Sequence, residues 1–201
     1  MEWRLIKKTP LYQGFFHLAA YDLSHALFAG GTSPVLRREL LDRGNAVAVL
    51  PYDPEKDSVV LIEQFRIGAK DDTSGPWLME IIAGYQEEGE DEEDVAIREA
   101  REEAGCEIRQ LIPMHRYYST PGSSNEQIHL YLALVDATNV SGIHGLEAEG
   151  EDIRAHVVDL EKALEMLDRG EIDSAMPIIA LQWLALHKEK IHHHWKNNNG
   201  Q

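Results

Sequence analysis

Residues 84–106 read GYQEEGEDEEDVAIREAREEAGC, and this stretch predicts one α-helix between two loops. Asp91 is suited to cap the start of the helix, and acidic residues fill its first turn, where the helix dipole favours them. Gly105 stands where a left-handed residue commonly ends a helix. The residues expected to face the core are Ile97, Ala100 and Ala104.

Three carboxylates gather on one patch of this helix. Glu99, Glu102 and Glu103 are neighbours there, because side chains three or four residues apart have Cβ atoms about 5–6 Å from each other. Like charges at this spacing oppose helix formation, and a hard divalent cation with oxygen ligands would compensate for them. The alternative is a solvated acidic face offset by Arg98 and Arg101.

The whole stretch resembles the Nudix box, which specifies seven residues over a span of 23. The matching residues are Gly84, Glu90, Arg98, Glu99, Glu102, Glu103 and Gly105. So many specified positions make a far stronger signal than a lone glycine motif. The resemblance to the Nudix hydrolase family implies a loop, helix and loop that bind Mg²⁺ and cleave a nucleoside diphosphate linked to another group.

Composition limits the partners. The chain has 201 residues and a net charge of −16, which disfavours nucleic acid and anionic membranes, since both attract basic surfaces. A transmembrane span and a signal-peptide pattern are both missing from the sequence, so we expect a cytoplasmic protein. Cys106 is the single cysteine and is expected to be a packed thiol.

The rest of the chain divides into three parts. Residues 1–43 form a β-rich segment with expected strands at 3–7, 14–23 and 35–41, too small to fold alone and expected to pack on a partner subunit. Residues 44–190 form the main domain, and 191–201 a frayed tail. The main domain's expected strands are 46–50, 58–66, 77–83, 106–111, 114–119, 127–136 and 153–158. Its later helices are expected to begin at Asp159 and at Asp173 or Ser174, and the last, ending at Lys190, to be buried. The fold class is α/β, an α/β/α sandwich around a mixed β-sheet, as the Nudix resemblance also implies.

Beyond the box, the chain is similar to the ADP-ribose pyrophosphatases of the Nudix family, particularly the bacterial ones. The features that carry this similarity are RREL with RGNAVAVLPYD, VVLIEQFR, Pro121 fifteen residues after Cys106, and GIHGLEAEGEDIRAHVV. The resemblance implies hydrolysis of ADP-ribose to AMP and ribose 5-phosphate. It further implies two or three Mg²⁺ ions, with Mn²⁺ as the alternative, and a homodimer with exchanged N-terminal segments.

The same resemblance assigns roles to individual residues. The implied metal ligands are Glu99, Glu103, Glu151 and the carbonyl of Ala83. The implied catalytic residues are Glu149 as general base, Glu102, and Arg98, which orients the carboxylates. The implied substrate-binding residues are Phe15, Arg38, Glu39, Arg66, Tyr85 and Glu126. Glu90 is expected to brace the loop before the helix.

Other interpretations remain open from sequence. The same chemistry would serve another nucleoside diphosphate sugar, such as a GDP-sugar. The fold would also serve a nucleotide sensor without turnover, or an acidic scaffold protein, although the complete set of carboxylates argues against both. Phe15 has the alternative of a core aromatic, and the acidic loop LEAEGEDI that of a solvated loop.

Overall fold

The computed structural model describes residues 1–199, whose contacts divide the chain into two units. The N-terminal unit comprises Met1–Asn45 and Tyr117–Ile128. The main unit comprises Ala46–Arg116 and the chain from His129 onward. The N-terminal unit therefore contains residues 117–128 in addition to the segment predicted at residues 1–43. Within residues 1–199, the helices lack the long apolar stretch that crossing a membrane requires.

The N-terminal unit is a three-stranded antiparallel sheet of β1 (Trp3–Gln13), β2 (His17–His25) and β3 (Leu36–Asp42), in that order. Ala19 and Ala20 are the only fully buried apolar residues of these strands. Large apolar side chains instead face solvent, namely Trp3, Tyr12, Phe15, Phe28 and Val35. A single sheet with so little buried apolar surface has no core of its own.

The main unit contains a mixed sheet with three helices. Its strands are β4 (Asn45–Asp53), β5 (Ser58–Phe65), β6 (Trp77–Glu80), β7 (Ile82–Tyr85), β8 (Ile108–Tyr118), β9 (Gln127–Val135), β10 (Gly142–His144) and β11 (Ile153–Asp159). The strand order is β10-β11-β5-β4-β9-β8, with β6 paired to β5 and β7 to β4. The helices are α1 (Glu92–Ala104), α2 (Leu160–Asp168) and α3 (Ala175–Asn199), with short 3₁₀ turns η1 (Ile67–Ala69) and η2 (Glu147–Glu149).

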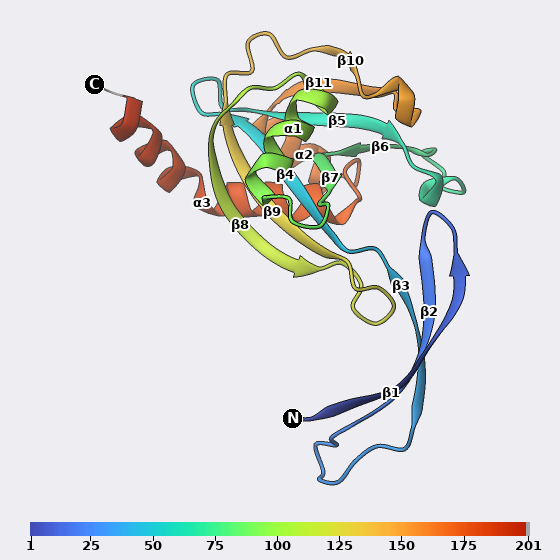
Figure 1. Ribbon diagram of the computed structural model, residues 1–201. Helices are drawn as coiled ribbons and strands as arrows, with labels where there is room; N and C mark the ends of the chain where they lie inside the picture. The colour runs from blue at the N-terminus through green and yellow to red at the C-terminus, as the bar shows by residue number, and fades with distance from the viewer. Residues whose placement is uncertain (200–201) are drawn as a thin grey trace. The chain divides into compact units, whose positions relative to one another are not determined.

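The helices cover both faces of this sheet (Figure 1). Val47 and Val49 of β4 belong to the core cluster that includes the buried face of α1. Tyr52 lies on the same strand but hydrogen-bonds to His192 of α3. Since alternate residues of a strand point to opposite faces, α1 and α3 lie on opposite sides of the sheet. The predicted α/β/α sandwich is confirmed.

Three of the strand predictions differ from the structure. The expected strand 14–23 begins only at His17, because residues 14–16 form the turn between β1 and β2. The expected strand 77–83 is divided into β6 and β7, which pair with different neighbours. The two strands expected at 106–111 and 114–119 are one continuous strand, β8. Pro113 lies inside it, which is tolerated because β8 is at the edge of the sheet, where a missing N–H breaks no ladder. The polar loop after residue 136 also contains β10 and η2, which the sequence analysis missed.

Helix α3 is longer and less buried than expected. Leu186 is 82% exposed, so one face of the helix is open to solvent. The helix continues through Asn199, where the sequence analysis predicted a frayed tail. Ile191 and Trp195 are buried, and this burial stabilises the added turns. The last two residues of the predicted tail lie outside the described residues.

Candidate active site

Helix α1 begins and ends as predicted. The Asp91 side chain accepts a hydrogen bond from the Glu93 N–H at 2.9 Å, and Gly105 adopts the left-handed conformation with φ of 61°. The predicted core stripe was partly wrong, because Ile97 is only half-buried. The apolar residues of α1 that are fully buried are Val95, Ala96, Ala100 and Ala104. The buried face of α1 is therefore rotated about the helix axis from the predicted stripe, and it includes Glu103.

Glu103 is a buried acid, only 3% exposed. Its Oε2 accepts a hydrogen bond from the Ala83 N–H on β7 at 3.0 Å. Burial raises the pKa of Glu103 to about 8, against that hydrogen bond, and the charges of Glu99 and Glu151 raise it further. Burying a carboxylate beside two others costs free energy, and a bound cation would offset that cost.

Glu99 lies directly over Gly84 at the end of β7. A β-carbon built on Gly84 would lie 1.8 Å from Glu99 Oε1, so any larger residue there would displace the carboxylate. Burial raises the pKa of Glu99, although the guanidinium of Arg98, 2.6 Å away, opposes the shift. The first glycine of the motif thus makes room for one of its acids.

Arg98 lies among three carboxylates. Its guanidinium is 2.6 Å from Glu99, 3.3 Å from Glu90 and 3.5 Å from Glu102. Glu90 also accepts a hydrogen bond from the Glu87 N–H at 3.2 Å, which ties the loop before α1 to the same arginine. Arg98 therefore contacts Glu99 and Glu102, whose carboxylates it was expected to orient, and Glu90 contacts the loop that it was expected to brace. Glu102 is the most open of the three acids.

Glu80 contacts a predicted site residue, and sequence reasoning did not single it out. This carboxylate is buried, and its Oε2 lies 2.6 Å from Nε of Arg66, the predicted phosphate-binding residue. A charged residue within the apolar run LMEII, residues 78–82, was the available signal. Tyr85, the last residue of β7, is exposed.

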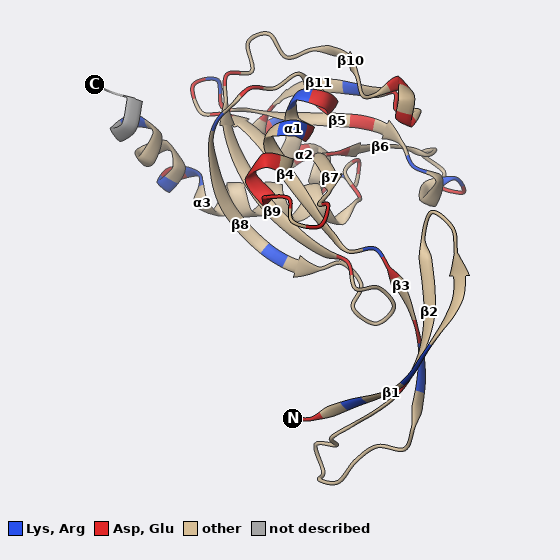
Figure 2. Cartoon of the chain, in the orientation of Figure 1, with Lys and Arg blue, Asp and Glu red and all other residues tan. Residues whose placement is uncertain are grey.

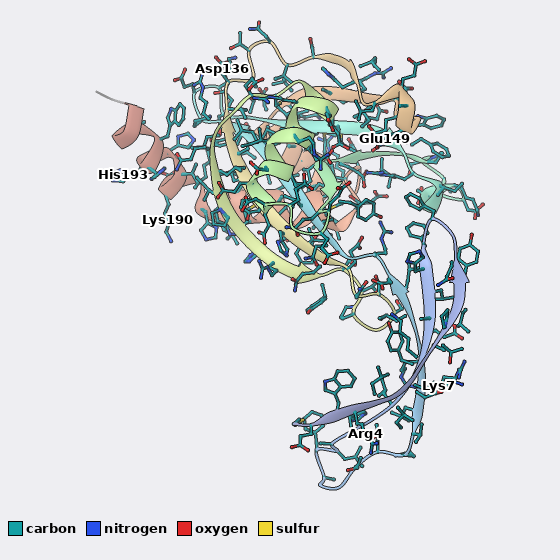
Figure 3. The ribbon with its side chains drawn as sticks, viewed as in Figure 1. Arg4, Lys7, Asp136, Glu149, Lys190 and His193 are labelled. Carbon is teal, nitrogen blue, oxygen red and sulfur yellow. The ribbon has the colours of Figure 1, made fainter. Side chains whose placement is uncertain are left out.

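The connection between β10 and β11 carries Glu149, which is labelled in Figure 3, and Glu151. Glu151 Oε2 accepts a hydrogen bond from the Leu146 N–H at 3.0 Å. The negative charge of Glu151 raises the pKa of both Glu99 and Glu103. Glu149 lies on η2 and is exposed. Figure 2 shows acidic residues on both α1 and this connection. The structure thus brings Glu151 to the helix acids and leaves Glu149 facing solvent.

The acids suit a hard divalent cation in their chemistry, since all of them offer carboxylate oxygens. Within residues 1–199, no three acidic, histidine or cysteine side chains converge closely enough to hold a metal ion. Instead Glu99 pairs with Arg98, Glu103 with the Ala83 N–H and Glu151 with the Leu146 N–H. Rotation of these side chains would exchange protein donors for a cation.

A second cluster fixes the start of α1, and the sequence did not indicate it. Glu92 accepts hydrogen bonds from the Tyr131 hydroxyl at 2.6 Å and from Arg116 at 2.9 Å. The buried His129 on β9 places Nδ1 2.5 Å from the same carboxylate. Glu92 therefore connects α1 to β8 and β9, away from the other acids of the box.

The other predicted substrate residues lie in the N-terminal unit. Phe15 is 85% exposed in the β1–β2 turn, so the alternative of a core aromatic is wrong. Arg38 and Glu39 are both exposed on β3, and as successive strand residues they point to opposite faces. Glu126 forms an ion pair with Arg43 at 2.8 Å. The thiol of Cys106, in the main unit, is buried as expected, and this burial raises its pKa to about 12.

The sheet, the helix and its gathered acids define a Nudix hydrolase fold. The NUDIX domain family model matches residues 42–189, and the chain belongs to the Nudix family. It is 48% identical to the ADP-ribose pyrophosphatase of Escherichia coli K12 over 191 residues, covering 95% of this chain and 91% of that protein. It is 45% identical to the ADP-ribose pyrophosphatase of Haemophilus influenzae over 197 residues, covering 96% and 91%. It is 36% identical to the GDP-mannose pyrophosphatase of Cronobacter sakazakii over 186 residues, covering 90% and 94%.

Proposed function

We propose that the protein hydrolyses ADP-ribose to AMP and ribose 5-phosphate, with Mg²⁺ as its cofactor. One water molecule is consumed, and one bond of the pyrophosphate is broken. The observation that carries the proposal is the set of Glu99, Glu103 and Glu151 around the Nudix helix. Similarity to ADP-ribose pyrophosphatases over nearly the whole chain supports the choice of substrate.

Glu99, Glu103, Glu151 and the carbonyl of Ala83 are the residues we assign to two or three divalent ions, with Mn²⁺ as an alternative. When bound, such ions neutralise a pyrophosphate and lower the pKa of a water molecule. Arg98 holds Glu99 and Glu102 in place for this task. Glu102 has the supporting role, since it is nearer to solvent than Glu99.

Glu149 is the proposed general base, which takes the proton of the attacking water. Its exposed position on η2, between Gly145 and Gly150, suits a residue that reaches the reaction centre only when substrate is bound. Arg66 is the proposed phosphate ligand, and the buried Glu80 orients its guanidinium. Phe15, Arg38, Glu39, Tyr85 and Glu126 are the proposed contacts to the base and the terminal ribose.

A substrate panel tests this function. We expect the protein with Mg²⁺ to convert ADP-ribose to AMP and ribose 5-phosphate faster than it cleaves other nucleoside diphosphate sugars. Product identification by chromatography measures both the rate and the bond that is cut. Preferential cleavage of a GDP-sugar would move the assignment to the second activity, which the GDP-mannose pyrophosphatase relatives suggest. No turnover of any member would favour a nucleotide sensor.

We further propose a cytoplasmic homodimer in which each N-terminal unit completes the partner's site. The support is the exposure of large apolar side chains in a unit that lacks a core, such as Trp3 on β1 and Phe28 in the β2–β3 connection. Light scattering should give twice the chain mass. Phe28→Glu should weaken the dimer and lower activity, whereas Leu186→Glu, on the exposed face of α3, should do neither. A fully active monomer would contradict the shared site.

A further inference from the structure

His144 and Gly145 form the stem of the β10–β11 connection. This stem contacts the C-terminal end of α1 at two points. The Gly145 N–H donates a hydrogen bond to the Glu102 carbonyl at 2.9 Å. The imidazole of His144 lies over Gly105, where an added β-carbon would be 2.9 Å from its Cε1. Both contacts are to the helix that carries Glu99 and Glu103.

The backbone contact has a clear physical reason. The last four carbonyls of a helix have no partner within it. The carbonyls of Ala100 and Arg101 accept hydrogen bonds from the Cys106 and Gly105 N–H groups. The carbonyl of Glu102 accepts from Gly145 instead, so the acid-bearing loop supplies a partner for one of the end carbonyls of the helix.

His144 is itself held in place. Its Nε2 donates to the carbonyl of Ser141, the residue before β10, at 3.0 Å. The residue pairs with the buried Ile153 in the register between β10 and β11. The residue is half-buried, and the hydrogen bond to Ser141 holds its ring as a spacer beside Gly105. Gly105 has two reasons to lack a side chain, its positive φ and this imidazole.

The part of the loop beyond this stem forms a small closed turn. The Glu151 carboxylate accepts a hydrogen bond from the Leu146 N–H at 3.0 Å, and the Glu151 N–H donates to the Leu146 carbonyl at 3.2 Å. A β-carbon on Gly145 would lie 2.7 Å from Cβ of Glu151. The turn encloses η2 and Glu149. The position of Glu149 relative to Glu99 therefore depends on the two contacts of the stem with α1.

We propose that His144 is a positioning residue, which fixes the stem of the loop on α1 and so sets where Glu149 can reach. The inference rests on the proposed hydrolysis and on Glu149 as its base. His144 does not touch substrate; it acts through the loop. A displacement of about 1 Å at a reacting group can cost about 10²-fold in rate, so a missing spacer is expected to reduce kcat.

The test compares His144→Ala with His115→Ala, which removes an exposed histidine on β8. We expect His144→Ala to lower kcat by about 10- to 100-fold with KM within about twofold of the wild-type value. Amide hydrogen exchange of residues 145–151, measured without substrate, should become about tenfold faster or more. His115→Ala should change neither quantity. If His144→Ala does not fold, His144→Gln, which keeps a donor for Ser141 but no ring over Gly105, is measured in the same way.

A double variant separates positioning from general structural damage. If His144 acts through Glu149, the variant carrying both His144→Ala and Glu149→Gln should be no slower than Glu149→Gln alone. Losses that multiply, or a His144→Ala enzyme with wild-type kcat and unchanged exchange, would overturn the proposal. Faster exchange is expected even if the wild-type protein cleaves a different substrate, so failure of the proposed function is seen separately in the substrate panel.

Discussion

Glu149→Gln should lower kcat by about 10²–10⁴-fold while leaving Mg²⁺ and substrate affinity nearly unchanged. The amide keeps the size of the side chain but cannot accept the proton of the attacking water. Because Glu149 is exposed on η2, its replacement should not disturb the fold. Steady-state kinetics with ADP-ribose, together with calorimetric titration of Mg²⁺, measures both parts of this prediction.

Two neighbouring acids serve as controls for Glu149. Glu147→Gln changes the same exposed turn and should leave kcat within a fewfold of the wild-type value. Glu151→Gln should instead weaken metal binding. The Glu151 carboxylate is a proposed metal ligand, and it lies near enough to Glu99 and Glu103 for its charge to raise their pKa values. Normal turnover of Glu149→Gln would assign the base to another carboxylate, with Glu102 or Glu147 next to be replaced.

Glu103→Gln should reduce turnover by at least about 10³-fold, because a lost metal ligand removes several kcal/mol of charge stabilisation in the transition state. Mg²⁺ affinity should fall in the same variant. The matched control is Glu93→Gln, an exposed acid on the same helix, which should retain activity and metal binding. Unchanged metal affinity in Glu103→Gln would show that Glu103 is not a ligand.

In the metal-free protein, Glu103 should make the free energy of unfolding depend on pH. Burial raises the pKa of Glu103 from 4.5 to about 8, so across this range the folded state holds a proton that the unfolded state has released. The contribution of Glu103 to stability therefore falls as pH rises from about 4.5 to 8. Urea unfolding with a chelator present should show this slope, and Glu103→Gln should make it smaller. An equal slope in both proteins would assign it to other groups.

Local sequence determined the Nudix helix because its signals act within one turn. Asp91 caps the first turn and Gly105 ends the last, and each needs only its near neighbours. The spacing of Glu99, Glu102 and Glu103 places them on one patch wherever a helix forms. Arg98 reaches Glu102 for the same reason, since the two are four residues apart. The sequence also predicted the layered α/β/α architecture, since its pattern gives runs of strands with helices interleaved among them.

Only the tertiary structure decided which groups from distant segments meet. Glu80 meets Arg66 because β6 pairs with β5, and Glu92 meets His129 because α1 packs on β9. No local pattern encodes such pairs, which depend on strand register and on the rotation of a helix about its axis. His144 over Gly105 is a further case, in which two residues 39 positions apart share one small space. The sequence determined the chemical groups that the site contains, whereas long-range packing determined their partners and therefore their charge and position.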